Sequence, residues 1–150
     1  SMTCVIKHFN DLDTTELYEL LKLRSAVFVV EQNCVYQDCD DKDQSSFHLL
    51  VYDQDELIAS ARCLPPGISY EEYCSIGRVV SSTKHRKSGA GRYVMECAIA
   101  VCKAEFKGYD IKISAQSYLK NFYESLDFVY TGKEYMEDNI PHCEMIRKNS

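Results

Sequence analysis

A short stretch with phosphate-binding chemistry lies in the middle of the chain. The segment HRKSGAGRYV, residues 85–94, places Gly89 and Gly91 one residue apart between a basic run and a long apolar stretch. Glycines let a ligand approach the main chain, and free N–H groups at the start of a following helix attract anions. Basic side chains flank the glycines, at Lys84, Arg86, Lys87 and Arg92. The segment therefore predicts a site for a phosphate or diphosphate group.

Two nucleotide-binding motifs use the same chemistry but do not fit these residues. A dinucleotide fingerprint GxGxxG that begins at Gly89 needs glycine at position 94, where the chain has Val94. A P-loop needs GxxxxGK followed by serine or threonine, which occurs nowhere in the sequence. A NAD-binding domain is therefore disfavoured. The pattern that remains is RxxGxG, formed by Arg86, Gly89 and Gly91.

The sequence offers no convincing metal site. In the acidic stretch DCDDKD, residues 38–43, counting a calcium loop from Asp38 puts Lys42 at position five and Asp43 where glycine is required. The cysteines and histidines do not have the spacing of a zinc site either. We therefore expect no metal, and we interpret the acidic stretch as a solvated loop that attracts a cationic acceptor.

Hydrophobic periodicity predicts the elements that position the glycine loop. We expect the order β-α-β-β-β-α-β-α-β-β, with strands near 4–9, 47–52, 56–64, 75–82, 111–115, 128–135 and 142–148, and helices at 13–32, 92–106 and 117–126. Asp13 and Glu16 form a capping box at the start of the first helix. At its end, the stretch VFVVEQ predicts that Val27, Phe28 and Val30 are buried.

The glycine loop belongs to a predicted βαβ unit. The strand near 75–82 leads into the loop and a largely apolar helix, and the strand 111–115 follows. A crossover of this kind is right-handed and joins parallel strands. Ligands of such units bind beyond the carboxyl ends of the strands, where the helix begins.

Length and composition limit the class of protein. The chain has 150 residues, which fits a single domain spanning 1–150, and a net charge of −6, which disfavours nucleic acid as a partner. No apolar run reaches the roughly 18 residues of a membrane span. Ser1 before Met2 resembles a cloning scar, and no signal peptide follows it. We expect a cytoplasmic protein whose eight cysteines are reduced.

The motifs together resemble the GNAT superfamily of N-acetyltransferases. RxxGxG is similar to its pyrophosphate-binding pattern, and AQSYLKNFYESLDF, residues 115–128, is similar to its second signature. A closer resemblance is to the ElaA-like family, carried in order by LRSAVFVVEQNCVYQDCD, His48, IGRVV, AQ, NFY and EYMEDNIPHCEM. Two positions depart from the pattern, since Asp127 and Asn139 stand where glycine is usual; both residue types tolerate a left-handed turn.

This resemblance implies a fold, a cosubstrate and a set of site residues. The fold is α/β, with a mixed central sheet and helices on both faces, and the cosubstrate is acetyl-CoA. Asn121 would contact the pantetheine arm or brace the loop, and Tyr123 would protonate the leaving sulfur. Main-chain N–H groups around Val79 and Val80 would stabilise the oxyanion. The residues implied to contact acetyl-CoA are Val79, Val80, Arg86, Lys87, Ser88, Gly89, Ala90, Gly91, Arg92, Asn121 and Tyr123.

Removing a proton from the acceptor is the larger chemical task. An alkylammonium of pKa ~10.4 costs about 4 kcal/mol to deprotonate near neutral pH, whereas releasing a thiolate from a thiol of pKa ~8.5 costs only about 1.5 kcal/mol. Glu31 and His142 are the candidate bases. Many superfamily members carry a glutamate on the fourth strand for this step, but CSIGRVV, residues 74–80, has none.

The sequence thus predicts acetyl transfer from acetyl-CoA to an amine by direct attack on the thioester. The acceptor is a small-molecule amine or a protein amine, and a homodimer is compatible with the sequence. Two alternatives stay open. One is an acyl-CoA-binding or interaction domain without turnover; the other is an acyl-enzyme formed on Cys63, Cys74 or Cys143.

Overall fold

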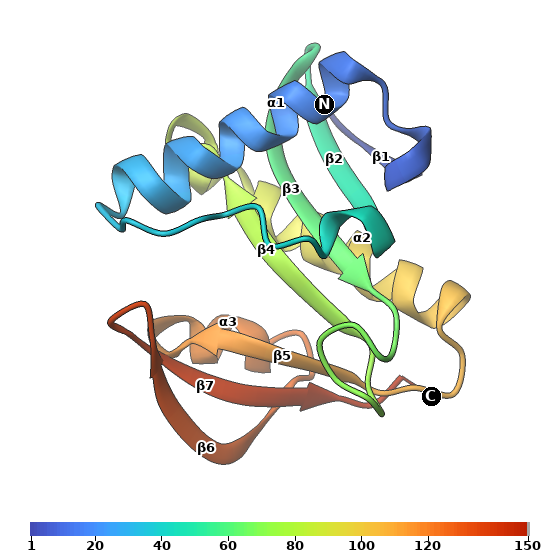
Figure 1. Cartoon of the computed structure of the whole chain (residues 1–150), viewed down its shortest axis with the longest axis vertical. Coiled ribbons are helices and arrows are strands. Elements are labelled where there is room, and N and C mark those ends of the chain that lie inside the picture. The colour runs from blue at the N-terminus through green and yellow to red at the C-terminus, as the bar shows by residue number, and fades with distance from the viewer. Residues whose placement is uncertain (150) are drawn as a thin grey trace.

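The computed structural model describes residues 1–149, whose strands form two antiparallel sheets (Figure 1). The first sheet has the order β1-β2-β3-β4 and the second the order β5-β7-β6. The strands are β1 (Met2–His8), β2 (Phe47–Asp53), β3 (Glu56–Leu64), β4 (Ser75–Ser81), β5 (Ile111–Gln116), β6 (Val129–Glu137) and β7 (Ile140–Arg147). Their order along the chain is the predicted one.

Three α-helices connect the strands: α1 (Thr14–Arg24), α2 (Ala90–Glu105) and α3 (Lys120–Glu124). The predicted capping box at α1 is confirmed, because the Asp13 side chain accepts from the Glu16 N–H at 2.7 Å and the Glu16 carboxylate accepts from the Asp13 N–H at 2.9 Å. A 3₁₀ segment, η4 (Thr83–Ser88), precedes α2. Within residues 1–149, no helix is both long enough and apolar enough to cross a bilayer.

The first predicted helix changes type before it ends. After Arg24 the backbone continues as a π-helical segment, η2 (Ser25–Glu31). Each turn of such a segment holds more residues than an α-turn, so side chains rotate away from the face that α1 presents. Val27 stays buried and Phe28 is half-buried, but Val30 is 75% exposed. The prediction that Val30 is buried is therefore wrong.

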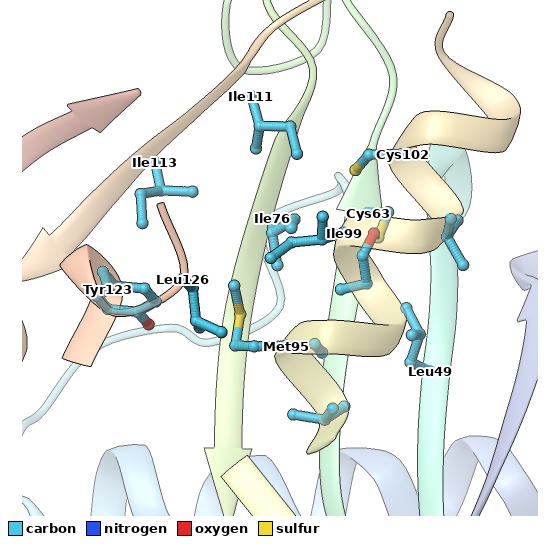
Figure 2. Close-up of a cluster of buried hydrophobic side chains, with 14 of the residues drawn as sticks. Leu49, Cys63, Ile76, Met95, Ile99, Cys102, Ile111, Ile113, Tyr123 and Leu126 are labelled. Atoms are coloured by element: carbon cyan, nitrogen blue, oxygen red, sulfur yellow. The ribbon is translucent and has the colours of Figure 1, made fainter. Parts of the chain in front are cut away.

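Helices pack on both faces of the first sheet, as predicted. Met95 and Ile99 of α2 point toward the strands on one face (Figure 2), whereas Leu23 of α1 contributes to a second cluster on the other face. Neighbouring residues of β2 divide between these two layers: Leu49 belongs to the cluster beneath α2 and Leu50 to the cluster beneath α1. This division follows from the alternation of side chains along a strand.

Within the described residues, main-chain pairing joins the two sheets at one point. A single parallel bridge joins Cys74, just before β4, to Ile111 at the start of β5. There the Cys74 N–H donates to the Asp110 carbonyl at 3.2 Å, and the Lys112 N–H donates to the Cys74 carbonyl at 3.0 Å. Beyond this bridge β4 and β5 diverge (Figure 1). The predicted parallel pairing is therefore confined to the first residues of the two strands.

The acidic loop, residues 38–43, is not solvated as predicted. Three of its aspartates join three arginines in what we call the Asp–Arg network: Asp38, Asp40 and Asp43 with Arg24, Arg62 and Arg78. Arg24 is only 1% exposed, and its guanidinium donates to Asp38 at 2.8 Å and to Asp43 at 2.8 Å. Burial alone raises the pKa of Asp43, but the hydrogen bonds and charges of Arg24 and Arg62 outweigh it and lower that pKa.

The rest of the Asp–Arg network ties the loop to the first sheet. Arg62 of β3 donates to Asp40 at 2.6 Å and to Asp43 at 2.9 Å, and Arg78 of β4 donates to the Asp38 carbonyl at 2.8 Å. The hydroxyl of Tyr36 also donates to Asp38, at 3.0 Å. These contacts fix the loop after η2 against β3 and β4.

Candidate functional site

A cleft of about 750 Å³ opens where β4 and β5 diverge. Its walls come from both strands, from η2 and the loop after it, from the start of α2, from α3, and from the hairpin of β6 and β7. It brings together nine of the predicted site residues: Glu31, Val79, Val80, Arg86, Gly89, Gly91, Arg92, Tyr123 and His142. Four others, Lys87, Ser88, Ala90 and Asn121, do not line the cleft.

The glycine loop lines the cleft at the start of α2. Gly89 has φ 84°, a left-handed conformation that glycine adopts at little cost, and it forms the N-cap of α2. No side chain caps the start of this 16-residue helix. A Cβ atom added at Gly91 would meet nothing within 4 Å, so the space beside the first turn is open. An uncapped helix start beside open space suits an anionic ligand.

The predicted residues around the glycines have different roles in the fold. Ala90 is fully buried, so only its main chain can contact a ligand. The Ser88 hydroxyl donates to the His85 carbonyl at 2.5 Å and closes the turn before α2. Arg92 donates to the Ser125 hydroxyl at 2.9 Å, which joins α2 to the end of α3. Asn121 is exposed on α3.

Glu31 and Arg86 form an ion pair across the cleft mouth. Both carboxylate oxygens of Glu31 accept from the Arg86 guanidinium, one of them at 2.7 Å, and Thr83 adds a hydrogen bond at 3.1 Å. The hydrogen bond from Arg86 is the main cause that lowers the pKa of Glu31. A carboxylate with a lowered pKa and two occupied oxygens is a poor proton acceptor.

Tyr123 lies on α3 with its ring in the core. It is 7% exposed and packs edge-on against Phe128 at 5.8 Å between ring centroids, in the same cluster as Leu126 and Ile113 (Figure 2). Burial raises the pKa of Tyr123 to about 12. The phenol therefore keeps its proton near neutral pH. Asp127, which follows this helix, has φ 69°, the left-handed turn predicted for it.

A bulge in β4 shapes the opposite wall. On β3, Arg62 pairs with Gly77 and Ser60 pairs with Val80. The two residues Arg78 and Val79 therefore lie opposite the single residue Ala61. Arg78 has φ 47°, a left-handed conformation that is uncommon outside glycine. Bulges of this kind interrupt the ladder and turn main-chain groups aside. Sequence patterns do not reveal this bulge, because the residues of β4 have the pattern of an uninterrupted strand.

The β6–β7 hairpin carries His142 into the cleft. Asp138 and Asn139 have φ 51° and φ 62°, the two positive values of a two-residue type I′ turn. The left-handed turn predicted at Asn139 is confirmed. The turn pairs Glu137 with Ile140 and Tyr135 with His142 across the strands. Glu137 also lines the cleft. Sequence reasoning missed Glu137, although Asp and Asn between two strands are both residue types that tolerate the positive φ of such a turn.

His142 and Tyr123 lie on opposite faces of the second sheet. Ala115 of β5 pairs with Cys143 of β7, and both belong to the core that contains Tyr123. The next pair, Gln116 with His142, must point to the other face because side chains alternate along a strand. The cleft therefore has a phenol on one side of β5 and an imidazole on the other.

The cysteines proposed as alternative nucleophiles do not face the cleft. Cys63, Cys74 and Cys143 are buried and do not line the cleft. Burial is the first cause that raises the pKa of the Cys143 thiol, and a hydrogen bond with Cys102 is the first cause that raises that of Cys74. Such thiols are poor nucleophiles near neutral pH.

Comparisons with known proteins agree with this geometry. The profile of the family described as "Acetyltransferase (GNAT) domain" matches residues 14–148. Protein ElaA of Escherichia coli is 40% identical over 143 residues, covering 94% of this chain and 93% of that protein. A UPF0039 protein of Schizosaccharomyces pombe is also 40% identical, over the same shares of the two chains.

Solved structures of similar proteins share the fold. The crystal structure of an acyl-CoA N-acyltransferase from Pseudomonas aeruginosa has a TM-score of 0.92 and 39% identity, covering 99% of this chain and 100% of that one. The crystal structure of Escherichia coli ElaA has a TM-score of 0.91 and 37% identity, with the same coverage. This chain has the acyl-CoA N-acyltransferase fold and belongs to the GNAT acetyltransferase family.

Proposed function

We propose that the protein transfers an acetyl group from acetyl-CoA to an amine. One observation carries this proposal: the uncapped start of α2 opens into the same cleft as Tyr123 and His142. That arrangement provides a diphosphate site at one end and proton-transfer groups farther in. Within the described residues all eight cysteines are free, which is consistent with a reaction in the reducing cytoplasm.

The glycine loop is proposed to hold the diphosphate of acetyl-CoA. The main-chain N–H groups of Gly89, Ala90 and Gly91 supply uncharged donors, and the α2 dipole favours the negative charge. Arg92 lines the same part of the cleft and adds a cation. Acetyl-CoA supplies an activated thioester, so the chain itself needs only to position it and to move protons.

Two groups are proposed to stabilise the charge that develops at the thioester. Val79 and Val80 line the cleft beside the β4 bulge, and their main-chain N–H groups are the proposed donors to the oxyanion. Tyr123, protonated and almost fully buried, is the proposed acid for the departing sulfur. The acceptor amine is a small molecule or a protein side chain.

The base is proposed to be His142 rather than Glu31. Arg86 occupies both oxygens of Glu31 and lowers its pKa. His142 faces the cleft from the side of β5 opposite Tyr123, so an amine entering there would meet the base before it reaches the thioester. The fourth strand offers no glutamate that would compete for this step.

Acetyl-CoA turnover tests this function directly. The purified chain is incubated with acetyl-CoA and a panel of alkyl, aryl and polyamines, and thiol release is followed with a chromogenic disulfide. We expect amine-dependent thiol release and an N-acetylated product by mass spectrometry. Stabilisation by acetyl-CoA in thermal unfolding without thiol release from any amine would favour the alternative of a binding domain without turnover.

Gly91→Val tests the diphosphate assignment. A Cβ atom at this position would meet nothing within 4 Å, so the fold should tolerate valine, whose side chain would occupy the open space beside the α2 N–H groups. We expect acetyl-CoA affinity to fall about ten-fold or more, which corresponds to about 1.4 kcal/mol. Calorimetric titration measures the affinity, and Ala100→Val at an exposed position on the same helix is the control. An unchanged dissociation constant would show that the diphosphate does not bind at the glycine loop.

A further inference from the structure

The side chains of Glu137 and His142 lie next to each other at the end of the β6–β7 hairpin. The Nδ1 atom of His142 lies 2.7 Å from the Ile140 carbonyl, which can only accept, so Nδ1 carries a hydrogen. In the neutral ring Nε2 is therefore the atom with the free lone pair. The nearest carboxylate oxygen, Oε2 of Glu137, lies 3.4 Å from Nε2, too far for a strong hydrogen bond. The lone pair stays available.

The hairpin fixes this geometry from several directions. The ring of Tyr135 stacks on the imidazole, at 6.2 Å between centroids and 16° between planes, and the Tyr135 hydroxyl donates to Ser114 on β5 at 2.5 Å. The side chain of His142 is 8% exposed and that of Glu137 is 54% exposed, and both line the cleft. The imidazole is thus held in place at the wall, with an accessible carboxylate beside it.

Resting on the acetyl transfer proposed above, we propose that Glu137 and His142 form a proton-accepting pair for the acceptor, and that the acceptor is a cationic alkylamine. Glu137 attracts the ammonium group, and Nε2 of His142 removes its proton. The carboxylate then stabilises the imidazolium ion that results. Glu137 is the substrate-binding member of the pair, and His142 is its catalytic member.

The charges around this part of the cleft support a cationic acceptor. Glu31 is paired with Arg86, and Arg78 is paired with aspartates of the Asp–Arg network. Among the described residues, no lysine or arginine forms an ion pair with Glu137 or with the neighbouring Asp138, which also lines the cleft. The hairpin therefore presents two carboxylates that are not neutralised by the protein's own cations.

The proposed step balances in atoms and charge. The ammonium group gives one proton to His142, and its nitrogen then bonds to the acyl carbon while the carbon–sulfur bond breaks. The nitrogen loses a second proton to solvent, and the departing sulfur takes a proton from Tyr123. His142 passes its proton to solvent and Tyr123 regains one from solvent, so one proton is released for each amide formed.

Two amines of equal ring size separate this role from a structural one. Cyclohexylamine is a cation near neutral pH and needs a base, whereas aniline is already neutral. With acetyl-CoA saturating, His142→Gln should lower kcat for cyclohexylamine by about 10²–10³-fold, the range of general-base catalysis. Its rate with aniline should change by less than about three-fold, since no ammonium proton has to be removed.

Glu137→Gln should act mainly on KM. The amide keeps the shape but removes the charge, so KM for cyclohexylamine should rise about ten-fold while KM for aniline stays the same. Glu134→Gln is the matched control: it makes the same charge change on β6, opposite Cys143 and away from the cleft, and should leave both amines unaffected. The unchanged aniline rate also shows that each variant is folded.

Three outcomes would overturn the pair without overturning acetyl transfer. Equal losses with both amines would make His142 and Glu137 structural residues. Wild-type rates for cyclohexylamine in both variants would show that the acceptor binds at another part of the cleft. The proposal of acetyl transfer would not be affected. Failure of the wild-type protein to use cyclohexylamine, while it uses other amines, would exclude a general alkylammonium site. Absence of thiol release with every amine tested would instead remove the proposed function, and the pair with it.

Discussion

Replacing Arg24 with methionine is expected to lower the free energy of unfolding by about 3–5 kcal/mol, because removing one partner of a buried ion pair leaves the other charge buried. Arg24 is 1% exposed and binds both Asp38 and Asp43. Methionine has a similar volume, so the loss of stability results from the missing charge and not from a cavity. Urea unfolding followed by circular dichroism measures the change.

The effect should depend on pH in a defined direction. The pKa of Asp43 is lower in the folded chain than in an unfolded one, so the ion pairs contribute stability above the unfolded value of about 3.9 and lose it as the pH falls through the folded pKa. The difference in the free energy of unfolding between wild type and Arg24→Met should therefore be largest at neutral pH and become smaller below about pH 4.

A neighbouring charge on the same helix provides the control. Lys22 is exposed, and Lys22→Met should change stability by no more than about 0.5 kcal/mol. Equal effects of the two substitutions would show that the Asp–Arg network adds no more to stability than a surface charge. Because the network also fixes the loop that carries Tyr36 into the cleft, Arg24→Met should in addition raise KM for the acceptor.

Replacing Tyr123 with phenylalanine is expected to lower kcat about 10²-fold, the lower end of the range for a positioned acid, while acetyl-CoA affinity stays nearly unchanged. The ring keeps its packing against Phe128, so loss of the hydroxyl should not disturb the fold. Stopped-flow or steady-state thiol release gives kcat, and calorimetry gives the affinity.

Tyr109→Phe is the matched control for Tyr123→Phe. Tyr109 is 43% exposed and lies outside the cleft, so removing its hydroxyl should leave turnover unchanged. Wild-type kcat in the Tyr123 variant would mean that this ring only packs. A parallel loss of acetyl-CoA affinity and kcat would mean that the hydroxyl positions the cosubstrate and does not protonate the sulfur.

The order of strands and helices follows from local patterns and was predictable. Sequence patterns identified the seven strands and three α-helices of the described residues, and short signals such as the Asp13 capping box and the left-handed Asp127 and Asn139 agree with the structure. The RxxGxG loop also lies where the βαβ pattern put it. These features depend on neighbouring residues in the chain, which is what a single sequence displays.

Features that depend on distant contacts were not predictable in this way. Arg24 reads as a surface residue of an amphipathic helix, and nothing local reveals partners 14 and 19 residues away in an apparently solvated loop. The π-helical end of α1 has no sequence signal strong enough to show that Val30 turns outward. The ion pair of Glu31 with Arg86 joins residues 55 positions apart.

The tight turn at Asp138 and Asn139 has a consequence for how this enzyme family member would tolerate changes in length. Because side chains alternate with a period of two, inserting one residue into that turn would swing Glu137 or His142 to the opposite face and separate them. Inserting two would restore the face but not the spacing. The eight residues from Tyr135 to His142 form one hairpin segment, distinct from the glycine loop at α2. If Glu137 and His142 act on the acceptor as proposed, exchanging this hairpin between relatives should change acceptor preference without changing acetyl-CoA affinity.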